Sequence, residues 1–128
     1  DLSFSGILTN LKQKYDSKKF VEEDLCYSMQ ETAFSMLTEV AERALAHCNK
    51  KELLLGGGVA CNNRLQEMNK IMCGERGAKF FVPDNNLLVD NGVMIAYQGL
   101  LEYSAGTREK EVSVRPYERT DDVFVNWK

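Results

Sequence analysis

The stretch LLLGGGVACNN (Leu53–Asn63) consists of a short apolar run, three glycines and a pair of asparagines. An uninterrupted apolar run of this length is typical of a strand that is buried on both faces of a sheet. Asparagine is a preferred N-cap residue, and apolar residues at helical spacing follow it at Leu65, Met68 and Met72. The stretch therefore predicts a strand, a tight turn and a helix in succession, with Asn62 or Asn63 as the cap.

A second strand and a further helix are expected downstream. Gly74 or Gly77 ends the helix, because glycine is the usual residue just past a helix C-terminus. Lys79–Val82 is a second apolar run, and Asp90 opens another helix that runs to about Tyr103.

Two helices are expected upstream. Ser5 is placed to cap a short amphipathic helix, and residues Glu23–Asn49 form a long one. Its apolar stripe is expected to pack in the core, and its charged residues (Glu31, Glu39, Glu42 and Arg43) are interpreted as a solvated face.

Strands that alternate with helices favour an α/β architecture with a mostly parallel sheet flanked by helices. The tail, Val112–Trp127, alternates loosely and is expected to add one or two strands. Ligands of such sheets gather at the carboxyl ends of the strands. Both Gly56–Asn63 and Asp84–Gly92 leave strands at that end, so the two loops are expected to line one crevice.

Composition sets further bounds. The chain has 128 residues, 44% of them hydrophobic and 27% charged, which fits one soluble globular domain. A net charge of −3 gives no support to non-specific nucleic-acid binding by this chain itself. No apolar run approaches the ~20 residues of a membrane span, and no signal peptide is visible. The sequence starts inside a patterned segment at Asp1, which suggests a fragment or a processed product.

The four cysteines form no CxxC pair. Cys26, Cys48 and Cys73 lie in helical stretches and are interpreted as small buried thiols. Since His47 is the only histidine, a Cys/His zinc site is not expected, and the pattern suits a reducing compartment.

Three motifs carry candidate chemistry. The turn Gly57–Gly58 with Asn62 lets the backbone approach a nucleotide closely, although a plain turn with an asparagine cap explains the same residues. Asp90 at a helix start fits either a cap or a ligand of a divalent cation beside phosphates. Ser3–Gly6 fits either a phosphate contact or a serine cap.

These motifs lie in blocks that resemble one family. The blocks are SFSGIL (Ser3–Leu8), SMQETAFSMLTEVAERALAH (Ser28–His47), GGVACNNRLQEM (Gly57–Met68) and DNGVMIAYQG (Asp90–Gly99). They resemble the universal tRNA threonylcarbamoyltransferases, which comprise bacterial TsaD and the catalytic subunit of the archaeal and eukaryotic KEOPS complex. The ending RTDDVFVNW (Arg119–Trp127) is similar to that of the archaeal and eukaryotic branch.

The resemblance implies an actin-like ATPase (ribonuclease-H-like) fold, in which two lobes clasp a nucleotide. Residues 1–128 would be part of the C-terminal lobe, with the N-terminal lobe absent from this chain. Members of the family transfer threonylcarbamoyl from threonylcarbamoyl-adenylate to the N6 amine of adenosine 37 in tRNAs that read ANN codons.

Carried over by position, Asn62 would contact the nucleotide, with Gly57 and Gly58 as the close-approach turn beside it. Asp90 would ligate a divalent metal, which is iron in several members, with magnesium or zinc as alternatives. No catalytic residue is assigned. The other metal ligands of the family, an HxxxH pair, have no counterpart here, so the isolated chain is expected to be inactive.

The implied ligand is ATP or threonylcarbamoyl-adenylate. The implied partners are tRNA, the small kinase subunit and the small dimerising subunit of KEOPS, and the N-terminal lobe. The expected location is the cytoplasm, or the nucleus in a eukaryote, without membrane contact. Two alternatives stay open: a non-catalytic ATP-binding or docking module of KEOPS, and the older description of the family as a glycoprotein endopeptidase.

Overall fold

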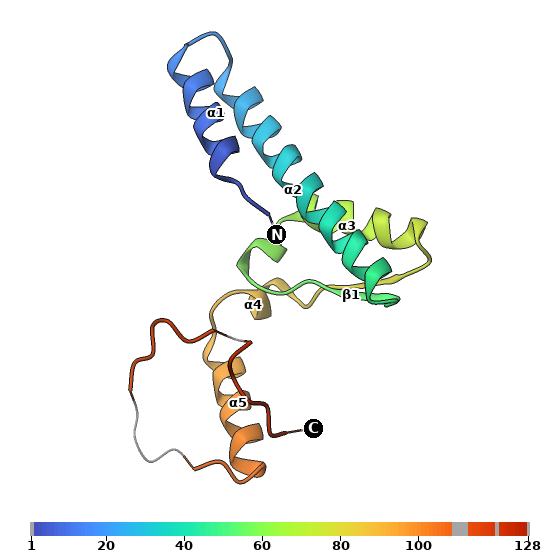
Figure 1. Cartoon of the computed structure of the whole chain (residues 1–128), viewed down its shortest axis with the longest axis vertical. Helices are drawn as coiled ribbons and strands as arrows, with labels where there is room; N and C mark the ends of the chain where they lie inside the picture. Colours follow the sequence, from blue (N-terminus) through green and yellow to red (C-terminus); the bar gives the residue numbers. More distant parts are fainter. Residues whose placement is uncertain (1, 109–112, 120, 128) are drawn as a thin grey trace. The chain divides into compact units, whose positions relative to one another are not determined.

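A computed structural model describes residues 2–108, 113–119 and 121–127. The chain divides into two compact units, one ending at Leu88 and the other beginning at Val89, and each is described by itself. The elements in chain order are α1 (Ser5–Asp16), α2 (Glu22–His47), β1 (Glu52–Leu54), the 3-10 turn η1 (Gly58–Cys61), α3 (Asn63–Glu75), β2 (Lys79–Phe81), α4 (Asn85–Leu88) and α5 (Gly92–Ser104) (Figure 1).

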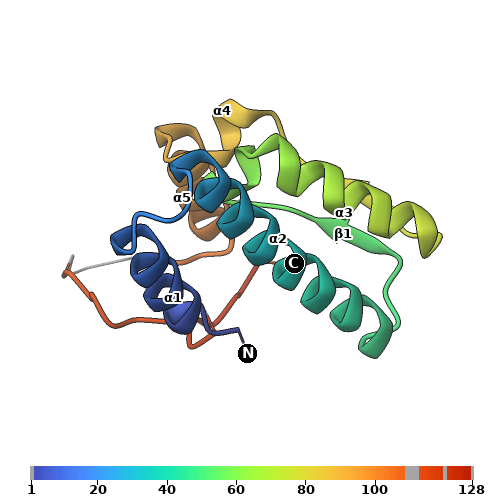
Figure 2. The same cartoon turned by 90° about the horizontal axis from the view of Figure 1, so that it is seen from above.

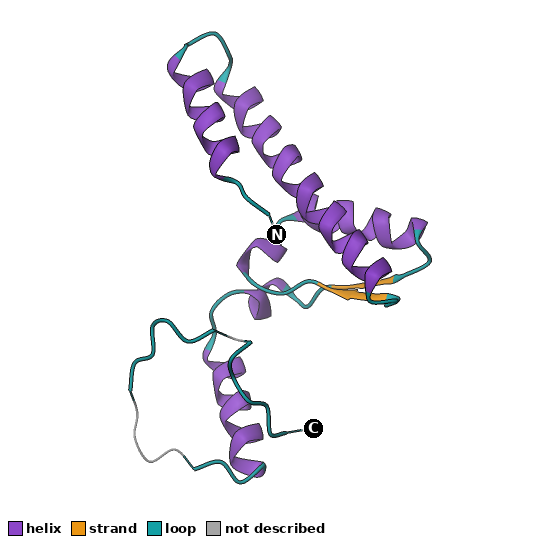
Figure 3. Ribbon diagram, viewed as in Figure 1, coloured by secondary structure: helices purple, strands orange, loops and turns teal. Residues whose placement is uncertain are grey.

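The sheet of the first unit is small and parallel. β1 pairs with β2 in the register Glu52↔Lys79, Leu53↔Phe80 and Leu54↔Phe81, and Figure 3 shows the two strands side by side. The prediction of a parallel α/β arrangement is confirmed at this level. Burial of β1 on both faces was a wrong expectation, because Leu54 is 68% exposed and Leu53 alone of the two packs against the helices.

Helices α2 and α3 cover one face of this sheet (Figure 2). Leu45, Met72 and Cys73 are buried between them and the strands, and the half-buried Leu53 and Phe80 complete this cluster from the sheet side. Burial of one such aliphatic side chain contributes roughly 1.5–3 kcal/mol, so this cluster holds the two helices on the strands.

Helix α2 begins and ends within two residues of its predicted bounds. Its first turn contains three acidic residues, Glu22, Glu23 and Asp24. Their negative charges stabilise the helix by interacting with the positive end of its dipole. The predicted core stripe is only partly buried, and Met29, Val40, Ala44 and Cys48 are exposed. Helix α2 is contacted by α1, by α3 and by β1, and the buried residues of the helix itself are Leu25 and Leu45.

The expected serine cap of α1 is absent. Phe4 occupies the N-cap position and makes no side-chain bond to the helix, and Ser5 is already the first helical residue. The Ser5 hydroxyl lies 3.2 Å from that of Ser3. Whether this pair contacts phosphate stays a prediction.

The cysteine prediction is right for one residue of three. Cys73 is buried, and its burial raises the pKa of the thiol. Cys26 in the first turns of α2 and Cys48 at its C-cap are exposed, so for these two the prediction is wrong. All four cysteines have free thiols, and none forms a disulfide bond.

The second unit is built on α5. Asn91 caps this helix by accepting from the Met94 backbone N–H at 2.9 Å. Asp90 precedes the cap, so its predicted capping role is wrong. The tail strands are absent from residues 113–119 and 121–127, where the backbone N–H groups of Glu118 and Asp122 donate to the carbonyls of Arg115 and Arg119. Val112 lies outside the described residues.

Helix α5 is rich in apolar residues, and none of its side chains is buried. Across the described residues, no helix is both long enough and apolar enough to traverse a bilayer.

Candidate functional site

The glycine turn after β1 needs glycine at one position for conformational reasons. Gly57 has φ +89 and ψ 166, a region that only glycine adopts without strain. Gly58 starts η1 with an ordinary φ, and a Cβ at either glycine would meet no atom within 4 Å. The fold therefore requires Gly57, whereas nothing in the fold requires Gly58.

Asn62 is the N-cap of α3, one of the two residues that the sequence offers for this position. Its Oδ1 accepts from the backbone N–H groups of Arg64 at 2.9 Å and Leu65 at 3.4 Å. Its Nδ2 donates to Oε1 of Gln30 on α2 at 3.2 Å. An amide has two acceptor sites and two donor hydrogens, so one N–H of Nδ2 remains. Any bond from this side chain to a ligand is therefore a donation.

Two further contacts fix the shape of the turn. Gln66 reaches back from α3 and donates through Nε2 to the carbonyl of Ala60 at 2.7 Å. The thiol of Cys61 lies 3.6 Å from the carbonyl of Asn85, the first residue of α4. The Gly56–Asn63 and Asp84–Gly92 loops were expected to lie close together. This is confirmed for the second loop up to Leu88, where α4 packs on η1. The part from Val89 onward belongs to the second unit.

Arg64 joins the first turn of α3 to α2. Its Nε and Nη2 each lie 2.8 Å from an oxygen of Glu31, and its Nη1 lies 2.6 Å from Glu67. The hydrogen bonds from Arg64 hold the pKa of the Glu31 carboxyl below its ordinary value, and both glutamates raise the pKa of Arg64. The positive charge on the turn is therefore matched by two carboxylates.

The interpretation of Glu31 as part of a solvated face is wrong. Its side chain is 22% exposed and fully engaged with Arg64. Glu42 likewise pairs with Arg76 at 2.7 Å, which ties the C-terminal halves of α2 and α3. Sequence reasoning missed Gln30, Glu31 and Arg64, although all three lie inside the quoted motif blocks, because their partners are 32 or 33 residues away.

Asp90 lies in the second unit, and its side chain is exposed. The hollow beside it is lined by Asn91, Gly92, Met94, Ile95 and Ala96. Within the described ranges, no group of three or more His, Cys, Asp or Glu side chains could hold a metal ion. The described residues therefore do not make a complete metal site, and Asp90 offers one carboxylate. His47 is exposed at the end of α2, in the other unit.

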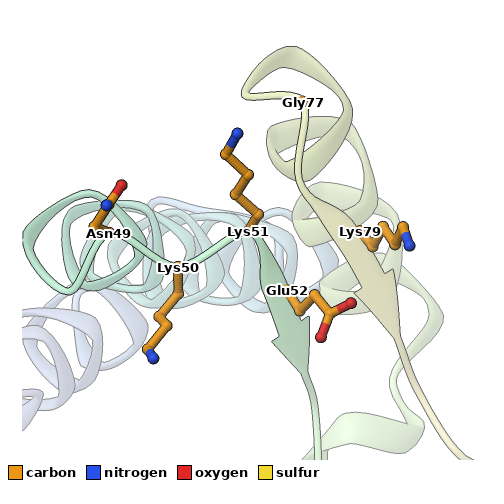
Figure 4. A pocket seen from close by; sticks show the side chains of 6 residues that line it. All are labelled: Asn49, Lys50, Lys51, Glu52, Gly77 and Lys79. Carbon is orange, nitrogen blue, oxygen red and sulfur yellow. The ribbon is translucent and has the colours of Figure 1, made fainter.

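Another hollow lies within the first unit, at the amino ends of β1 and β2. It is lined by Asn49, Lys50, Lys51, Glu52, Gly77 and Lys79. Figure 4 shows the three lysine side chains pointing in different directions, with the Glu52 carboxylate among them. Because these ammonium groups do not converge, the hollow does not form an anion site.

Comparison with known proteins adds a family match. A family model described as tRNA N6-adenosine threonylcarbamoyltransferase matches residues 1–97, which include Gly57, Gly58, Asn62 and Asp90. The tail beyond residue 97 lies outside this match.

Individual relatives agree. A tRNA N6-adenosine threonylcarbamoyltransferase of Thermococcus kodakarensis is 57% identical over 99% of this chain and 40% of its own length. Probable bifunctional tRNA threonylcarbamoyladenosine biosynthesis proteins of Methanosarcina barkeri and Methanococcus vannielii are 58% and 54% identical, over 99% of this chain and 23% of their own length. The chain thus spans between about a quarter and two fifths of these relatives.

Proposed function

The chain belongs to the tRNA N6-adenosine threonylcarbamoyltransferase family, and on that premise we propose that it is the nucleotide-contacting part of an enzyme that attaches threonylcarbamoyl to tRNA. The acceptor is adenosine 37 of tRNAs that read ANN codons, and the donor is threonylcarbamoyl-adenylate. ATP or this adenylate is the ligand of the glycine turn.

The observation that carries the proposal is the arrangement of Asn62. Its side chain caps α3 with one atom and keeps a free N–H on the other, directly after a turn that only glycine can form at Gly57. A nucleotide offers many acceptors for such a donor: ribose oxygens, phosphate oxygens and purine ring nitrogens. Because Oδ1 already accepts two hydrogen bonds from the helix, Asn62 would contact the nucleotide as a donor.

The lobe assignment is part of the same proposal. A parallel sheet with a glycine turn at its carboxyl edge is the place where α/β proteins bind nucleotides. In this account the chain is the C-terminal lobe of an actin-like ATPase, and an N-terminal lobe closes the nucleotide site from the other side. The isolated 128 residues are then inactive in transfer.

Asp90 is proposed as a single ligand of a divalent metal, with iron as the first candidate and magnesium or zinc as alternatives. A carboxylate is a suitable ligand for each of these ions. The remaining ligands would come from outside this chain. The described residues of this chain do not form such a site on their own.

The proposed partners follow from the same family membership. They are tRNA, the small kinase subunit and the small dimerising subunit of KEOPS, and the N-terminal lobe. The proposed setting is the cytoplasm, or the nucleus in a eukaryotic cell.

The test is threonine incorporation into tRNA by the complete gene product that carries this chain, assembled with these partners. We expect transfer by the wild type, and its loss in Asp90→Ala without loss of folding. Nucleotide binding without any transfer by the wild type would instead identify a docking module. Unchanged transfer by Asp90→Ala would remove Asp90 from the site.

A further inference from the structure

We infer that Gln30 is a positioning residue, which aims the remaining N–H of Asn62 at the nucleotide. This inference rests on the proposed function, because it concerns how the same turn recognises its ligand. Gln30 lies on α2, outside the turn itself, and reaches Asn62 by a single contact of 3.2 Å.

The direction of this hydrogen bond is fixed by the cap. Two backbone N–H groups point at Oδ1 of Asn62, so this atom must be the amide oxygen, and the atom that faces Gln30 must be Nδ2. Gln30 must in turn present its oxygen. The three bonds thus determine the orientation of both amides.

Gln30 controls where the last donor points. The two hydrogens of a planar amide nitrogen lie in the amide plane about 120° apart, so holding one of them sets the direction of the other. The cap bonds hold Oδ1, and the bond to Gln30 opposes rotation of the amide about its last side-chain torsion. Both Asn62 and Gln30 are half-buried, which reduces competition from water for this bond.

The neighbouring residue on α2 makes the contact rigid. Glu31 holds Arg64 by two hydrogen bonds, while Gln30 holds Asn62 two residues earlier in the chain. Helix α2 therefore contacts the start of α3 through two side chains, Gln30 and Glu31. Gln30 needs no contact with the ligand for this role.

The test measures ATP affinity in the complete gene product for wild type, Gln30→Met, Asn62→Ser and the double variant. Methionine keeps the length of glutamine but has no amide oxygen. Loss of one aligned hydrogen bond predicts roughly 3- to 10-fold weaker ATP binding for Gln30→Met. In the Asn62→Ser background, Gln30→Met should have no further effect, because the amide that it orients is gone.

The matched control is Gln13→Met on α1, an exposed glutamine for which the structure shows no side-chain hydrogen bond. It should leave ATP affinity unchanged. Should Gln30→Met fold poorly, Gln30→Asn, whose amide is one methylene too short to reach Asn62, should weaken ATP binding in the same way.

The outcomes are separable. Equal losses from Gln30→Met in the wild-type and Asn62→Ser backgrounds, or no loss in either, would overturn the role of Gln30 while Asn62 stays in the site. Unchanged ATP affinity in Asn62→Ser would overturn the proposed nucleotide site, and the role of Gln30 with it.

Discussion

Arg64 and Glu31 form a two-bond ion pair between helices α3 and α2, in which Nε and Nη2 of Arg64 each lie 2.8 Å from a carboxylate oxygen. This geometry matches the planar guanidinium to the planar carboxylate, which makes it stronger and more directional than a single contact. The pair lies two residues beyond Asn62, so it holds the start of α3 where the cap and the glycine turn require it.

Replacement of Glu31 by glutamine should lower the melting temperature of the chain by a few degrees. An amide cannot accept both bonds from Arg64, and it removes the charge that matches the guanidinium. Differential scanning calorimetry measures the shift. Glu39→Gln is the control, because the Glu39–Arg43 pair lies on the same helix with both side chains largely exposed. Equal shifts of the melting temperature in the two variants would show that the Glu31–Arg64 pair stabilises the fold no more than the exposed Glu39–Arg43 pair.

The same pair should make stability depend on acidity. Arg64 lowers the folded-state pKa of Glu31, so the stabilisation is fully present above the ordinary glutamate pKa of 4.5 and is lost as the pH falls through the lower folded value. Urea unfolding followed from pH 7 to pH 3 should show a loss of stability on the acid side. In Glu31→Gln this loss should be smaller, and identical acid limbs in both proteins would contradict the assignment.

The two glycines of the turn should respond differently to alanine. Gly57→Ala forces a side chain into the extended positive-φ region at φ +89 and ψ 166 and should cost about 1–3 kcal/mol of folding free energy. Gly58→Ala should leave stability unchanged, because its Cβ meets no atom within 4 Å. Both variants should weaken nucleotide binding.

Gly58→Ala is the more informative of the two, since it adds a methyl group at the proposed nucleotide contact without straining the fold. Chemical unfolding and ATP titration of the same samples separate the two effects. Full ATP affinity in Gly58→Ala would mean that the nucleotide does not approach this backbone closely.

Substitution of Asp90 tests the proposed metal ligand. Asp90→Asn in the complete gene product should reduce the bound divalent metal, measured by elemental analysis after gel filtration. Asp84→Asn is the control, because Asp84 is also exposed and its backbone carbonyl, not its carboxylate, bonds Leu87. An unchanged metal content in Asp90→Asn would leave this residue without a proposed role.

Local signals predicted the elements well. The asparagine cap of α3, a glycine with φ +63 just past the end of that helix (Gly77) and the parallel pairing of two short strands are all present. Each depends on residues within a few positions, or on the rule that alternating strands and helices produce parallel sheets. Family membership, likewise, follows from compact motif blocks.

Choices between neighbouring polar residues were not predictable. Asp90 and Asn91 are both good cap residues, and the backbone entering α5 places Asn91 at that position. At α1 the backbone places Phe4 at the N-cap and Ser5 inside the first turn, so no side chain caps this helix. Long-range partners were also hidden, because nothing local shows that Gln30 and Glu31 lie against a turn more than 30 residues later.

The central claim is that Asn62 donates a hydrogen bond to the nucleotide used for tRNA modification. Asn62→Ser tests it, because serine still caps α3 but is too short to replace the amide donor. Threonine incorporation into tRNA by the complete gene product with its partners is the measurement. We predict at least a tenfold loss of transfer with a melting temperature close to that of the wild type. Wild-type transfer by Asn62→Ser would contradict the account and reduce Asn62 to a helix cap.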